Sequence, residues 1–173
     1  MHQKLPHISL IDYYQFITFR TNESIDEYVT KIQEDQSLSA KNKQYQIDKY
    51  LDKSESGAYL FGKNINILKN IILEKNNSIY EVDILSIMPN HVHILIKQKG
   101  DLSKIMKYIK AKSAIELNKN FKREGKFWLE GYFDKIIRDQ KHYDLVYEYI
   151  LNNPIKASLE DFKERIYSKY EVF

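Results

Sequence analysis

The chain has 173 residues, of which 43% are hydrophobic and 29% charged, a composition typical of globular proteins rather than disordered ones. It contains no cysteine, so disulfides and cysteine-ligated zinc are excluded, and no apolar run is long enough to cross a membrane. The length favours a single domain over residues 1–173. The lack of an apolar leader leads us to expect a cytoplasmic protein.

The first half of the chain predicts a tail, one strand and a helical insert. We expect residues 1–12 to form a flexible N-terminal tail. The aromatic and β-branched residues of 13–20 predict the first strand. Apolar residues at helical spacing then predict an insert over 22–75, with Ser24 as an N-cap. The expected helices of this insert are 25–35, 40–52 and 63–75.

The second half alternates strands with longer helices. Its apolar patterns predict strands over 79–88, 91–97 and 132–137, and helices over 102–120 and 141–152. Pro154 is expected to end the last helix. This order predicts an α+β fold, with an antiparallel sheet and helices packed on one side, in a ferredoxin-like or RNA-recognition-type topology.

Two histidines stand one residue apart in the expected strand 91–97. Because side chains alternate along a strand, His91 and His93 should point to one face and Val92 to the other. Neutral imidazole is the commonest protein ligand for a divalent metal. The pair therefore indicates either a metal site or two partly buried histidines with ordinary hydrogen-bond partners.

A basic segment follows these strands. Between Lys97 and Lys126 there are ten Lys or Arg and three acids, which gives +7 on a chain whose net charge is +3. Such a patch indicates a polyanion bound at one face, or else a solvated lysine-rich helix.

The last expected helix carries Tyr149 and Asn153 four residues apart, and thus on one helical face. A phenol and a carboxamide so placed can serve as a nucleophile and a metal ligand. They can equally be packing residues at a helix terminus.

Together these motifs resemble the single-tyrosine HUH transposases, and specifically their REP-associated tyrosine transposase branch. The resemblance extends from about residue 13 to 172 and is weakest over 22–75. Ser158 stands where the family usually has glycine, a departure that concerns a turn. The matching stretches run from Met88 to His93, Gly125 to Trp128, Gly131 to Asp139 and Tyr149 to Ala157.

The resemblance implies a single-strand DNA endonuclease and strand transferase that forms a covalent 5′-phosphotyrosine. Tyr149 would be the nucleophile, and His91, His93 and Asn153 would bind a divalent metal, Mg²⁺ or Mn²⁺. The substrate would be single-stranded DNA folded as a hairpin, with a homodimer as one possible assembly. Residues expected to contact DNA phosphates are Lys104, Lys107, Lys110, Lys112, Lys122, Arg123 and Lys126.

Two alternatives stay open from the residues alone. An antiparallel sheet with aromatic residues can bind single-stranded nucleic acid without catalysis. A metal-dependent phosphodiesterase can use His91 and His93 with a carboxylate such as Asp83 or Asp134 and form no covalent intermediate. Replacing Tyr149 with phenylalanine separates the last case, because hydrolysis would survive the change.

Overall fold

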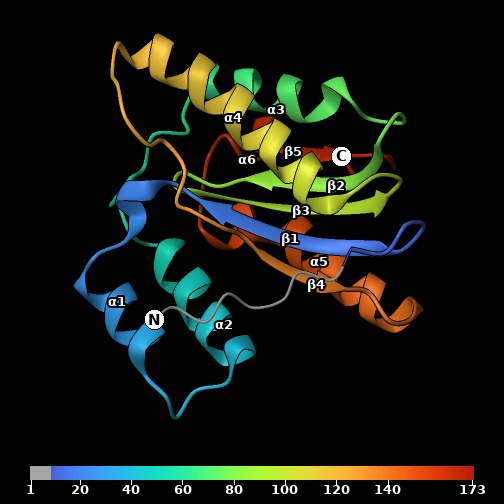
Figure 1. The fold of residues 1–173 in the computed structure, drawn as a ribbon, viewed down its shortest axis with the longest axis horizontal. Coiled ribbons are helices and arrows are strands. Elements are labelled where there is room, and N and C mark those ends of the chain that lie inside the picture. The colour runs from blue at the N-terminus through green and yellow to red at the C-terminus, as the bar shows by residue number, and fades with distance from the viewer. Residues whose placement is uncertain (1–8) are drawn as a thin grey trace.

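The computed structural model describes residues 9–173, which form a five-stranded antiparallel sheet with helices packed on it (Figure 1). The strands lie in the order β4-β1-β3-β2-β5. They are β1 (Tyr14–Arg20), β2 (Tyr80–Ile87), β3 (His91–Gln98), β4 (Phe133–Ile136) and β5 (Ile166–Ser168). The helices are η1 (Asn22–Ser24), α1 (Glu27–Glu34), α2 (Ala40–Leu51), α3 (Lys63–Glu74), α4 (Leu102–Phe121), α5 (Gln140–Lys156) and α6 (Phe162–Arg165).

The antiparallel α+β fold expected from the sequence is confirmed. β3 is the central strand and pairs with β1 on one side and β2 on the other. Nearly every residue of these three strands is buried, which their continuous apolar runs require. No helix among residues 9–173 is long and apolar enough to span a membrane.

Helices cover both faces of the sheet, where the sequence predicted one covered side. α3 and α4 lie against the face formed by Ile17, Val92 and Ile94. α5 packs on the opposite face, where Ile150 meets a smaller apolar cluster. The central strands are apolar on both faces, so each face needs a cover. The insert expected over 22–75 therefore falls into two parts, because its last helix, α3, belongs to the main core.

The rest of the insert, α1 and α2, forms a helical hairpin with its own small core of Val29, Ile32, Ile47 and Leu51. The predicted cap at Ser24 is wrong. Asp26 caps α1, and its carboxylate accepts hydrogen bonds from the backbone N–H groups of the next turn. Ser24 instead donates to the carbonyl of Thr21, which shapes η1.

The last long helix also differs from the prediction, since Pro154 lies inside α5 and does not end it. A proline removes only its own N–H, and the following backbone donors still bond to the helix: Ala157 donates to the Asn153 carbonyl at 3.0 Å. The turn comes at Ser158, whose φ of 56° is left-handed. This explains why glycine suits that position.

Hydrogen bonds tie segments near both ends of the described chain to the rest of the fold. Residues 1–8 of the expected tail lie outside the described residues. Asp12 donates to the Gln98 carbonyl at 2.7 Å, and the Ser9 hydroxyl accepts from the Gln98 amide, so residues 9–12 are held against β3. After α5, buried Arg165 donates to the carbonyls of Leu60 and Ile87.

Candidate active site around two histidines and a tyrosine

The two histidines lie side by side on the α5 face of β3, as the strand period predicts, and Val92 faces the main core on the other side. Both imidazoles are fully buried, and their ring centroids are 4.7 Å apart. The β1 register places Thr18 beside His93 and Arg20 beside His91. The sheet thus holds four polar side chains on one buried surface.

The neighbours of His91 fix its protonation. The Asn90 amide nitrogen donates to the carbonyls of Leu51, Ser54 and Ser56 at 3.1–3.3 Å, so its oxygen must be the group facing His91. That oxygen lies 2.8 Å from His91 Nδ1 and accepts its proton. The unprotonated Nε2 is buried and has no hydrogen-bond partner among residues 9–173.

His93 is also held through its Nδ1 atom. The Thr18 hydroxyl lies 2.7 Å from His93 Nδ1, and either atom can be the donor, so the group that faces Nε2 decides which ring nitrogen carries the proton. Burial lowers the pKa of His93 to about 3 and that of His91 well below its usual value. Both rings are therefore neutral near pH 7, the form that binds a metal.

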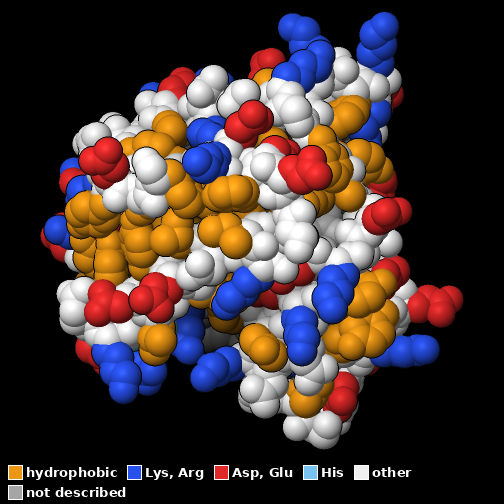
Figure 2. All heavy atoms as spheres, turned by 180° about the vertical axis from the view of Figure 1, so that it is seen from behind, with side chains coloured by type: hydrophobic (Ala, Val, Ile, Leu, Met, Phe, Trp, Pro, Cys, Tyr) orange, Lys and Arg blue, Asp and Glu red, His pale blue; other side chains and the backbone are white. Residues whose placement is uncertain are grey.

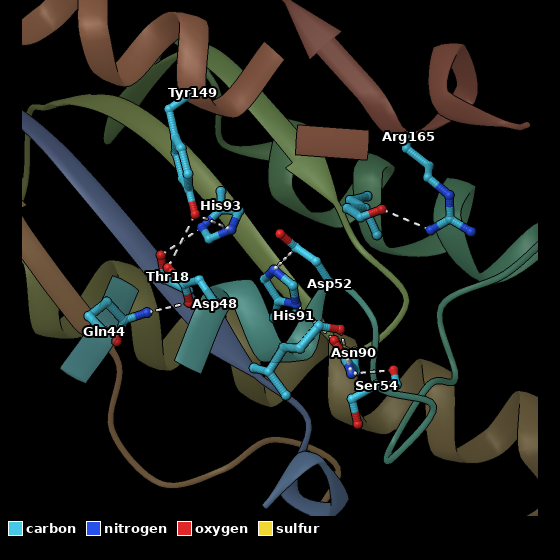
Figure 3. Close-up of polar contacts among 12 residues, drawn as sticks. Thr18, Gln44, Asp48, Asp52, Ser54, Asn90, His91, His93, Tyr149 and Arg165 are labelled. Carbon is cyan, nitrogen blue, oxygen red and sulfur yellow. Dashed lines mark hydrogen bonds and ion pairs between the residues drawn. The ribbon is translucent and has the colours of Figure 1, made fainter. Parts of the chain in front are cut away.

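Tyr149 and Asn153 reach this surface from one face of α5, as their spacing predicts. Figure 3 shows the Tyr149 hydroxyl pointing at His93, and it lies 3.5 Å from Nε2. With its amide nitrogen donating to Asp52, Asn153 accepts a hydrogen bond from His93 Nε2 on its oxygen at 2.8 Å, which puts the ring proton on Nε2. The structure thus brings together all four residues for which the sequence predicted chemistry.

Two carboxylates complete the group, Asp48 from α2 and Asp52 from its C-cap, and sequence reasoning missed both. Asp48 accepts a hydrogen bond from the Tyr149 hydroxyl at 3.3 Å, and Asp52 lies 3.6 Å from His91 Nε2 (Figure 3). Burial raises the pKa of each to about 7. The sequence does contain a hint that Asp48 is buried. It shares a helical face with the apolar residues Ile47 and Leu51, and a carboxylate is unusual on such a face.

Charge in the site is partly balanced by Arg20. Its guanidinium is largely buried, which lowers its pKa, and the nearby Asp48 carboxylate opposes that effect. Burial also raises the pKa of Tyr149, and the Asp48 and Asp52 charges add to the rise. The phenol is therefore protonated at neutral pH.

The residues fit a divalent metal, although no group of three or more His, Cys, Asp or Glu that could hold one occurs among residues 9–173. The donor set differs from such a cluster because it combines two imidazoles with an amide. His91 Nε2 is a buried lone pair without a partner. His93 Nε2 donates to the Asn153 oxygen, and a cation that replaced this proton would be bound by both atoms.

The predicted DNA-contacting residues are not brought to this site, because α4 covers the other face of the sheet. Lys110 donates to the carbonyls of Leu129 and Gly131, while Lys112 pairs with an acid of α3. Arg123 pairs with Glu23, and Lys126 lies 4.0 Å from Glu130 in the loop after α4. The residues of the set that are exposed are Lys104, Lys107, Lys122 and Lys126.

The carboxylates weighed for the hydrolase alternative also lie elsewhere. Buried Asp83 accepts a hydrogen bond from Tyr143 and lies 3.6 Å from Lys169. Asp134 pairs in register with Ile17, which places it on the α4 face, away from the histidines. Neither joins the histidine pair.

Comparison with known proteins gives structural matches and a family match. A REP-associated tyrosine transposase bound to a REP hairpin has the same fold, with a TM-score of 0.52 and 17% identity over 89% of this chain and 73% of the other. A candidate transposase from Deinococcus radiodurans R1 aligns with a TM-score of 0.48 and 15% identity, over 88% and 98%. No curated protein matches significantly. Residues 58–153, more than half of the chain, match the family described as "Transposase IS200 like". The chain therefore belongs to the IS200-like transposase family, as its motifs indicated.

Proposed function

We propose that this transposase cuts and rejoins single-stranded DNA through a covalent bond to Tyr149, with the help of a divalent metal. The observation that carries the proposal is the placement of the Tyr149 hydroxyl 3.5 Å from His93 Nε2, beside a second neutral imidazole. A nucleic-acid-binding module has no need for such a buried group, since burying unpaired polar atoms costs free energy.

The chemistry is an in-line displacement at phosphorus. The Tyr149 oxygen forms a bond to the phosphorus, and the bond from phosphorus to the 3′ oxygen breaks. The products are a 5′-phosphotyrosine and a DNA end with a free 3′-hydroxyl. Attack by another 3′-hydroxyl reverses the step and joins two strands, because the tyrosyl ester keeps the energy of the original bond.

Proton movement is the part of the step that this chain performs with its own groups. Asp48 accepts the Tyr149 hydrogen bond at 3.3 Å and is placed to take the proton as the tyrosine attacks. Its pKa of about 7 suits a base that works at neutral pH. Arg20, close to Asp48, keeps part of the carboxylate population charged.

The metal would be held by His91, His93 and the Asn153 oxygen. When bound, it would polarise the phosphodiester and offset the developing negative charge. Imidazole ligands accept Mn²⁺ well and Mg²⁺ less readily, so both ions are candidates.

The substrate would be single-stranded DNA that folds into a hairpin, the ligand named for the REP-associated relative. The exposed lysines of α4, Lys104 and Lys107, are suited to phosphates of a hairpin that extends beyond the sheet.

The test is a denaturing gel of wild-type protein and Tyr149→Phe with labelled hairpin DNA and Mn²⁺. We expect a protein-linked DNA band that requires both the metal and Tyr149, while Tyr149→Phe still binds DNA on a native gel. Cleavage that survives in Tyr149→Phe would contradict the proposal and support a metal-dependent phosphodiesterase.

A further inference from the structure

The edge strand β4 brings a lysine close to the candidate site. Lys135 pairs in register with Phe16, and paired residues share one face of a sheet. The Phe16 ring stacks on His93 at 5.7 Å between centroids and meets the Tyr149 ring edge-on at 5.9 Å. Lys135 therefore lies on the face that carries Tyr149, one strand outward from β1.

Three more basic side chains gather around Lys135, and together they form what we term the basic cluster: Lys41, Lys135, Arg138 and His142. Lys41 comes from α2, Arg138 lies between β4 and α5, and His142 is in the first turn of α5. Burial and the charges of Lys41 and Arg138 lower the pKa of Lys135. His142 Nδ1 accepts from the Arg138 backbone N–H at 3.3 Å.

In the described part of the chain, three members of the basic cluster, Lys41, Lys135 and Arg138, lack the acidic partners that other cations have. Arg123, Lys112 and Lys99 each pair with a glutamate on the surface. Within residues 9–173, no ion pair involves Lys41, Lys135 or Arg138. The nearby acid, Asp139, caps α5 by accepting from the His142 backbone. Like charges held together without a counter-charge are unfavourable, and a bound polyanion would relieve this.

The surface around the cluster has the shape and chemistry for a nucleic-acid strand. Figure 2 shows Lys and Arg side chains around a hollow on this face, between the α1–α2 hairpin and the β4–α5 region. Tyr45 stands one turn after Lys41 on α2 and is 61% exposed. An exposed aromatic ring beside cations is the combination that binds single strands, because bases stack on the ring and phosphates meet the cations.

We propose that the basic cluster binds the backbone phosphates of the single strand next to the bond that Tyr149 cuts, with Tyr45 stacking on a base. This inference rests on the proposed function and assigns the path of the strand to the α5 face of the sheet. The lysines of α4, on the other face, would contact only more distant parts of a hairpin.

The test measures binding of a fluorescent oligothymidylate, which forms no hairpin, by anisotropy over a series of salt concentrations without metal. Lys135→Gln combined with Arg138→Gln should weaken binding about tenfold or more. The slope of log affinity against log salt should fall by about 1.4, since each phosphate contact on a single strand contributes about 0.7. Tyr45→Ala should weaken binding and leave the slope unchanged.

The matched control is Lys63→Gln combined with Lys119→Gln, which removes the same charge from exposed positions on α3 and α4. The control should bind like wild type. Equal slopes for the control and the Lys135/Arg138 variant would overturn the inference, and so would wild-type protein that does not bind the oligonucleotide. If wild-type protein forms the covalent adduct at Tyr149 but the Lys135/Arg138 variant keeps the wild-type salt slope, only the role of the basic cluster is rejected. If wild-type protein neither binds the oligonucleotide nor forms the adduct, the proposed function is rejected as well.

Discussion

Replacing Asp48 with asparagine should stabilise the protein above pH 7 and at the same time abolish DNA cleavage. Asparagine has nearly the same shape, and it can still form hydrogen bonds with Gln44 and Tyr149. It carries no charge that must be buried. The substitution therefore isolates the cost of holding a carboxylate inside the site.

The magnitude follows from the pKa of Asp48, which burial raises from 3.8 to about 7. The folded state holds the proton more tightly than the unfolded chain, so stability is greatest below pH 4 and falls as the pH rises through 7. A difference of about 3 pKa units corresponds to about 4 kcal/mol, which is the upper limit of the gain for Asp48→Asn at pH 8. Below pH 4 the gain should disappear, because Asp48 is then neutral in both states.

The assay is urea unfolding of both proteins at pH 4, 6 and 8 in the presence of a metal chelator. Asp101→Asn serves as a control of opposite sign. Hydrogen bonds from Ser103 and the Lys104 backbone hold the pKa of Asp101 below its usual value. That variant should lose stability at neutral pH and match wild type in acid. If Asp48→Asn is equally destabilising at every pH, the carboxylate is not charged and buried as described.

Three further predictions concern single contacts. Arg165→Met should cost about 3 kcal/mol in urea unfolding, because it leaves the buried carbonyls of Leu60 and Ile87 without a donor; a loss under 1 kcal/mol would contradict this. Ser158→Gly should raise stability by about 0.5–1 kcal/mol, because φ is 56° there, and a loss would show that the turn differs. Asn90→Ala should weaken Mn²⁺ binding by about 10- to 100-fold in calorimetric titration, because Asn90 orients His91 and ties it to the end of α2. An unchanged affinity would show that His91 does not bind the metal.

Much of the fold was predictable because its elements follow local rules. The apolar runs of β2 and β3 flank Pro89 and Asn90, and the spacing of His91 and His93 fixes their shared face. The helical spacing of Tyr149 and Asn153 likewise fixed their common side. The helix stop at Pro154 was one of the wrong predictions, since a proline near a helix end can be accommodated when the residues after it still find acceptors.

Long-range placement was not predictable. Asp48 is 101 residues from Tyr149 in sequence, and only the folding of the α1–α2 hairpin over the α5 face brings them together. The basic residues between Lys97 and Lys126 formed the strongest charge signal, yet sequence spacing cannot tell which face of the sheet α4 will cover. Lys135 gave no such signal, because its neighbours Lys41 and Arg138 come from separate elements.

The measurement that tests the central claim most directly is the identity of the DNA end that becomes attached to Tyr149. Wild-type protein is incubated with Mn²⁺ and hairpin DNA labelled at either the 5′ or the 3′ end, and the adduct is digested and mapped by mass spectrometry. The account predicts that the 3′-labelled fragment is linked, through its 5′ phosphate, to the peptide containing Tyr149. The 5′-labelled fragment should be released with a free 3′-hydroxyl. Attachment at another residue, or two free DNA ends without an adduct, would contradict the account.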